Sequence, residues 1–230
     1  MKIIWLGHSG FRIEIAGKVL LIDPWLVGNP MFDEAHRAAA LAGVTHILIS
    51  HGHGDHAGNV IEIARETGAP IVAVFELAEI MAEITGNEGI AIGRGGTAKL
   101  GDVAVTLVAA SHSSSYPDSG TRGVAGSECG FMIAGEGRKI YFSGDTDIMA
   151  DMDWFGDYHR PDIGILSAGG VYTMDMAAAA YAAKRYFNFK TLIPCHYRTF
   201  DALEQSADRL KAALPGVDVI EPEVMVPITL

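Results

Sequence analysis

The chain has 230 residues, of which 49% are hydrophobic, and a formal net charge of −11 at pH 7. These values fit one globular domain over residues 1–230 and exclude a disordered chain. No run of Lys and Arg offers a surface for nucleic acid, and no apolar run approaches the ~20 residues that span a bilayer. Because no signal-peptide pattern opens the sequence, we expect a cytoplasmic protein.

The first half of the chain is predicted to begin with antiparallel strands and to continue with alternating strands and helices. Residues 11–15 alternate between apolar and polar side chains, which is the period of a half-buried strand. The predicted strands cover residues 3–6, 11–15, 19–22, 45–49, 70–74 and 89–93, and the predicted helices cover 33–42, 59–66 and 75–84.

The second half repeats this order in kind. Its predicted strands cover residues 97–100, 103–109, 130–134, 139–142, 162–166, 191–194 and 217–220, and its predicted helices cover 174–186 and 202–214. Two sheets packed face to face with helices outside would satisfy both halves. The polar loop 113–126 has the length of a flap over a site.

A dense group of metal-binding side chains follows the apolar run 47–50. His51, His53, Asp55 and His56 fall within six residues, with glycines between them that let the backbone turn. Imidazole and carboxylate are ligands that zinc, manganese and iron accept. Solvated loops also hold scattered histidines, but this density of donors favours a metal site.

Three further donors lie just beyond apolar strands. His112 follows the strand 103–109, Asp145 lies in a Gly-Asp turn after 139–142, and His196 follows 191–194. Taken singly, such residues are more often surface histidines or turn aspartates. Their joint placement at strand ends, where layered α/β folds bind ligands, favours one shared site.

The pattern H-x-H-x-D-H, followed by His, Asp and His, resembles the metallo-β-lactamase superfamily over nearly the whole chain. More narrowly, residues 7–10 (GHSG), 23–25 (DPW) and 194–197 (PCHY) resemble the UPF0173 metal-dependent hydrolases, a branch akin to the ascorbate-6-phosphate lactonases. The resemblance implies an α/β fold of the αββα four-layer sandwich type with two divalent metal ions at one edge.

The resemblance also implies how the donors divide between the two ions. One ion is held by His51, His53 and His112, the other by Asp55, His56 and His196, and Asp145 bridges both. Zinc is the first expectation, and manganese, nickel or iron also suit these ligands. Zinc β-lactamases often place a cysteine at the second ion, so β-lactam hydrolysis is not predicted here.

The expected reaction is attack of a metal-bridging hydroxide on a small ester, lactone or phosphoester. Asp55 is the expected proton acceptor, and His8 is a second catalytic candidate. Asp23, Arg122 and Tyr197 are candidates for contacting the substrate, which the helix N-terminus near residue 59 would favour as an anion. Turn, surface or core roles are the alternatives for these residues.

Three other functions stay open at this point. A phosphodiesterase or nuclease would use the same donors, but the negative net charge opposes a nucleic-acid substrate. A metal-binding or iron redox protein of the same fold would also keep the donor set. A Ser–His–Asp triad near His112 cannot be recognised from proximity in sequence. The expected partner is a small molecule without nucleic acid or membrane, and a homo-oligomer is compatible with the sequence.

Overall fold

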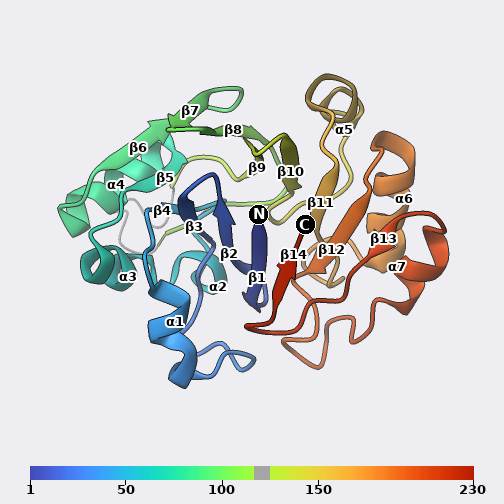
Figure 1. The fold of residues 1–230 in the computed structure, drawn as a ribbon, viewed down its shortest axis with the longest axis horizontal. Coiled ribbons are helices and arrows are strands. Elements are labelled where there is room, and N and C mark those ends of the chain that lie inside the picture. Colours follow the sequence, from blue (N-terminus) through green and yellow to red (C-terminus); the bar gives the residue numbers. More distant parts are fainter. Residues whose placement is uncertain (117–124) are drawn as a thin grey trace.

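The computed structural model describes residues 1–116 and 125–230 as two β-sheets packed face to face, with helices on their outer faces (Figure 1). This arrangement confirms the predicted αββα sandwich. The first sheet has the spatial order β14 (Pro227–Thr229), β1 (Lys2–Gly7), β2 (Gly10–Ile15), β3 (Lys18–Ile22), β4 (His46–Leu48), β5 (Ile71–Val74), β6 (Gly89–Ile92). The second has the order β13 (Asp218–Val219), β12 (Thr191–Cys195), β11 (Ile163–Ser167), β10 (Arg138–Phe142), β9 (Cys129–Gly135), β8 (Val103–Ala109), β7 (Thr97–Leu100).

Each sheet combines an antiparallel part with a parallel part. Strands β1, β2 and β3 pair antiparallel, and β3 to β6 continue in parallel. In the second sheet β8, β9 and β10 pair antiparallel, and β10 to β13 are parallel. Because parallel strands end at the same edge of a sheet, the loops after β4, β10 and β12 gather there.

The space between the sheets is filled by large apolar side chains. Trp5, Phe11, Phe131 and Phe142 are fully buried. Across the sandwich, the Phe11 and Phe142 rings lie 6.2 Å apart between centroids in an edge-on contact. Burial of each such ring contributes roughly 1.5–3 kcal/mol to folding, so this core fixes the two sheets relative to each other and keeps their common edge rigid.

The helices bury one apolar stripe each against the sheets. They are α1 (Arg37–Leu41), α2 (Gly54–Ala57), α3 (Val60–Thr67), α4 (Phe75–Thr85), α5 (Met152–Trp154), α6 (Met176–Tyr186) and α7 (Asp208–Ala213), with a 3-10 turn η1 (Glu34–His36) and a π-helical turn η3 (Phe155–His159). In α4 the buried stripe is Leu77, Ala78 and Met81. None of the helices within residues 1–116 and 125–230 is long and apolar enough to cross a bilayer.

Two predicted helices are shorter in the structure. The helix expected over 202–214 is confined to α7, because Ser206 Oγ accepts from Asp208 N, and Glu204 N donates outside the helix to Gly169 O. The helix expected over 33–42 is divided into η1 and α1. The short helix α2 was not predicted, although it carries two of the metal-donor residues.

Candidate metal centre

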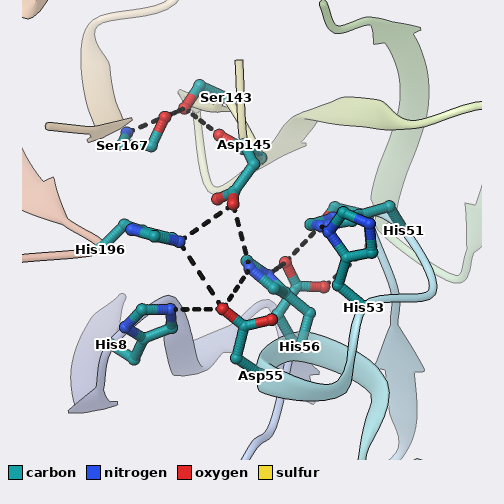
Figure 2. A network of polar contacts seen from close by, with 12 residues as sticks. His8, His51, His53, Asp55, His56, Ser143, Asp145, Ser167 and His196 are labelled. Atoms are coloured by element: carbon teal, nitrogen blue, oxygen red, sulfur yellow. Dashed lines mark hydrogen bonds and ion pairs between the residues drawn. The ribbon is translucent and has the colours of Figure 1, made fainter. Parts of the chain in front are cut away.

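All seven predicted donors converge at the edge where the parallel strands end. His51 and His53 follow β4, and the next turn of chain is helix α2, which carries Asp55 and His56. The other three come from the second sheet: His112 follows β8, Asp145 follows β10 and His196 follows β12. Figure 2 shows the side chains of six of them pointing toward one another.

The first donor cluster consists of His51, His53 and His112. One ring nitrogen from each lies within 4.8 Å of the others. His51 Nε2 and His53 Nδ1 are 3.0 Å apart. His51 is fully buried, whereas His53 and His112 are partly exposed, so this cluster borders solvent.

The second donor cluster consists of Asp55, His56 and His196, whose ligand atoms also lie within 4.8 Å of one another. Asp55 Oδ2 is 3.8 Å from both His56 Nε2 and His196 Nε2. His8 Nε2 belongs to the same group of atoms and lies 3.0 Å from Asp55 Oδ2.

Asp145 lies between the two clusters. Its Oδ2 is 3.0 Å from His196 Nε2 and 3.3 Å from His56 Nε2, both in the second cluster. The same oxygen is 3.7 Å from His112 Nε2 in the first cluster. A single carboxylate oxygen therefore reaches imidazoles of both clusters, as a ligand shared by two cations would.

Buried polar atoms without partners test whether a cation fits here. Within the described residues, His56 Nε2 and Asp145 Oδ1 are buried and make no hydrogen bond. Native proteins rarely leave such atoms unsatisfied. An imidazole nitrogen and a carboxylate oxygen facing one another are suitable ligands for a divalent metal, so the residues fit the group that the sequence implied.

The electrostatics of the cluster favour a positive charge between the carboxylates. Burial alone would raise the pKa of Asp145, but the imidazoles of His56 and His196 outweigh it and hold this pKa well below its ordinary value. Burial alone would lower the pKa of His56, but the carboxylates of Asp145 and Asp23 raise it well above its ordinary value. A cation binding here displaces the proton of His56, so metal binding releases protons.

Asp23 touches the imidazoles rather than the substrate side. It is fully buried, and its Oδ2 accepts from His56 Nδ1 at 2.9 Å and from Ser50 Oγ at 2.5 Å. Ser50 Oγ in turn lies 2.9 Å from His51 Nδ1. The prediction that Asp23 contacts the substrate is therefore not supported, because its carboxylate is used to orient one imidazole of each cluster.

His8 is also buried and holds Asp55 in place. Its Nδ1 lies 2.8 Å from Thr199 Oγ1, and its Nε2 faces Asp55 Oδ2. Burial lowers the pKa of His8 to about 4, although the hydrogen bond to Asp55 opposes this shift. A neutral ring that accepts from Thr199 and donates to Asp55 satisfies both contacts.

The other two substrate candidates have different outcomes. Tyr197 is fully buried, with its ring stacked on Trp5 at 5.7 Å, so it packs in the core and does not contact the substrate as predicted. Arg122 lies outside the described residues, as does much of the expected flap 113–126. Sequence analysis did not find Ser50 or Thr199. Ser50 could have been noticed as the neighbour of His51, but Thr199 has no local signal.

Gly169 offers a test of how tightly His196 is held. A Cβ at this position would lie 1.7 Å from the carbonyl oxygen of His196 and 3.3 Å from its Nδ1. We expect Gly169→Ala to displace His196, to weaken metal binding and to lower the free energy of unfolding by about 3 kcal/mol or more. Metal content and thermal unfolding measure both effects.

Gly93→Ala is the matched control, because a Cβ there meets nothing within 4 Å and the backbone has no left-handed φ. We expect this variant to keep the metal content and stability of the unmodified protein. If Gly169→Ala behaved like the control, the tight packing described around His196 would be wrong.

Comparison with known proteins follows the same direction as the geometry. A family model described as "Beta-lactamase superfamily domain" matches residues 2–196. Relatives named UPF0173 metal-dependent hydrolase are 61% identical in Cereibacter sphaeroides and 60% identical in Paracoccus denitrificans, each over the full length of both chains. The solved structure of Igni18, a metallo hydrolase from Ignicoccus hospitalis, has a TM-score of 0.85 at 31% identity and covers 100% of this chain and 98% of its own.

The sandwich and its cluster of imidazoles and carboxylates define a protein of the metallo-β-lactamase superfamily. Within that superfamily, the chain belongs to the UPF0173 metal-dependent hydrolases. This confirms the resemblance carried by the motifs at residues 7–10, 23–25 and 194–197.

Proposed function

We propose that this protein hydrolyses a small ester, lactone or phosphoester with the help of two divalent metal ions. The observation that carries the proposal is the position of Asp145, whose Oδ2 faces His56 and His196 on one side and His112 on the other. A carboxylate shared between two donor clusters has no role in a site for one ion.

The first cluster, the second cluster and Asp145 would hold the pair of ions. Two divalent ions at such positions lower the pKa of water toward neutrality and polarise a carbonyl or phosphoryl oxygen. Zinc is the first choice for imidazole and carboxylate ligands, and manganese, nickel or iron suit them as well. The chain itself then has to position these groups and move protons.

Asp55 is the residue that we assign to proton transfer. Its side chain is 32% exposed, against 3% for Asp145, so it is the more accessible of the two carboxylates. Burial alone would raise the pKa of Asp55, but the hydrogen bond from His8 and the nearby His56 hold it below its ordinary value. The carboxylate is therefore ionised and ready to accept a proton, and His8 keeps it oriented.

A side-chain nucleophile has little support in this site. Burial raises the pKa of both Cys129 and Cys195, which keeps their thiols protonated. Ser113 Oγ lies 3.4 Å from His53 Nε2, but the other nitrogen of His53 faces His51 rather than a carboxylate. The third member of a Ser–His–Asp triad is thus missing at this histidine.

The test is hydrolysis by protein with a defined metal content. Purified protein is assayed on p-nitrophenyl acetate, γ-butyrolactone and bis-p-nitrophenyl phosphate, before and after chelation and after re-addition of zinc or manganese. We expect turnover of at least one class, loss on chelation and recovery with two equivalents of metal. No turnover by the fully loaded protein, or turnover that survives chelation, would contradict the proposal.

The two alternatives give different results in the same preparation. A nuclease would cleave RNA at low salt faster than any small ester. An iron redox protein would retain stoichiometric iron when purified without added metal and would show visible colour. Either result would replace the proposed hydrolase.

A further inference from the structure

Exposed apolar side chains gather on the loops that follow the metal-bearing edge of the sandwich. Among the described residues, nine large hydrophobic side chains are exposed. Five of these nine follow the carboxyl ends of β3, β5, β11 or β12, namely Val27, Phe75, Val171, Tyr172 and Phe200. Solvent-exposed apolar groups concentrated beside a reactive centre are typical of a ligand-binding rim.

Two of the aromatic rings on this edge form a continuous surface, which we call the aromatic wall and define as Trp25 and Phe200. Their ring centroids are 6.1 Å apart at an interplanar angle of 34°. Trp25 is half-buried, and Phe200 is 41% exposed. The wall joins the loop after β3 to the loop after β12, so it links both sheets.

The aromatic wall lies directly over His8. The His8 ring centroid is 5.4 Å from Trp25 and 5.8 Å from Phe200, in edge-on contacts. His8 Nε2 in turn lies 3.0 Å from Asp55 Oδ2. A single buried side chain therefore separates the wall from the carboxylate that we assign to proton transfer.

Hydrogen bonds hold the backbone on both sides of the wall. Asn59 Oδ1 accepts from the backbone N–H groups of Leu26 at 2.7 Å and Val27 at 2.8 Å. Gln205 Nε2 donates to the carbonyl oxygen of Phe200 at 2.9 Å. Rings on a fixed backbone lose little entropy when a ligand packs on them, so this surface is already organised for binding.

We propose that the aromatic wall receives an apolar acyl or alkyl group of the ester or lactone whose hydrolysis is proposed above. The proposal rests on that function and narrows its substrate class. Neither side chain of the wall carries a charge, so the wall does not select a phosphate group. Substrates with a chain of several methylenes should therefore react faster than short or phosphorylated ones.

The experiment compares p-nitrophenyl esters from acetate to octanoate. Each methylene that packs on the wall is expected to raise kcat/KM about fourfold until the wall is covered. Phe200→Ala should lower kcat/KM for octanoate by about tenfold more than for acetate. Tyr181→Ala is the control, because Tyr181 is an aromatic residue on α6 that is 54% exposed and lies outside the metal-bearing edge.

A binding measurement separates failure of this inference from failure of the proposed function. Octanoate and acetate are titrated into the unmodified protein and the Phe200→Ala variant, and tryptophan fluorescence is followed, with Trp25→Phe assigning the signal. If octanoate binds through Phe200 but no ester is hydrolysed, the wall stands and the proposed function fails. If esters are hydrolysed without any effect of chain length or of Phe200, the function stands and the wall is wrong. Absence of a chain-length effect in both measurements overturns the wall, as does a preference for phosphorylated substrates.

Discussion

Asp145→Asn is expected to reduce the metal content below two equivalents and to lower turnover by about 10³-fold. The substitution keeps the size of the side chain but removes its charge and places N–H donors toward the imidazoles. Because Asp145 Oδ2 faces His56, His196 and His112, the loss weakens both clusters at once. Elemental analysis of the purified variant and its hydrolysis rate measure the two effects.

Asp147→Asn is the matched control for this prediction. Asp147 lies two residues further along the chain and is exposed, and its carboxylate accepts from Ile148 N at 2.7 Å. The same chemical change there should leave metal content and turnover as they were. An Asp145→Asn variant that kept two equivalents of metal and full turnover would remove the basis for a shared ligand.

Asp23→Asn is expected to weaken metal binding about 10- to 100-fold in both clusters without touching either metal position. It should also cost roughly 3–5 kcal/mol of stability in the metal-free protein, because the raised pKa of His56 depends partly on the buried Asp23 carboxylate. Competition with a chelator measures the affinities, and urea unfolding measures the stability.

Ser50→Ala separates the two branches of this network. Ser50 joins Asp23 to His51, whereas His56 contacts Asp23 directly. We therefore expect Ser50→Ala to weaken the first cluster and to leave the second nearly unchanged. Equal effects of Asp23→Asn and Ser50→Ala on both clusters would show that the carboxylate does not act through these two separate contacts.

The sandwich and the seven metal donors were accessible to sequence reasoning because both depend on local patterns. Apolar runs marked the strands, and His112, Asp145 and His196 each stand just after one. Parallel strands end at one edge, so residues placed after them meet there. The close approach of Asp145 to both clusters follows from that topology.

What the sequence did not predict depends on contacts between distant segments. Thr199 and His8 are 191 positions apart, and nothing near either residue announces their hydrogen bond. Asp23 was expected to meet the substrate because a strand-end carboxylate is compatible with either role, and only its burial beside His56 decides between them. Trp25 was expected to pack, and its partly exposed ring beside Phe200 depends on two loops that meet only in the folded chain.

Crystallography of the metal-loaded protein with anomalous scattering tests the central claim most directly. We predict two cations, one among His51, His53 and His112 and the other among Asp55, His56 and His196, with Asp145 contacting both. A single cation at full loading, or a map in which His112 or His196 points away from the cations, would contradict the dinuclear centre.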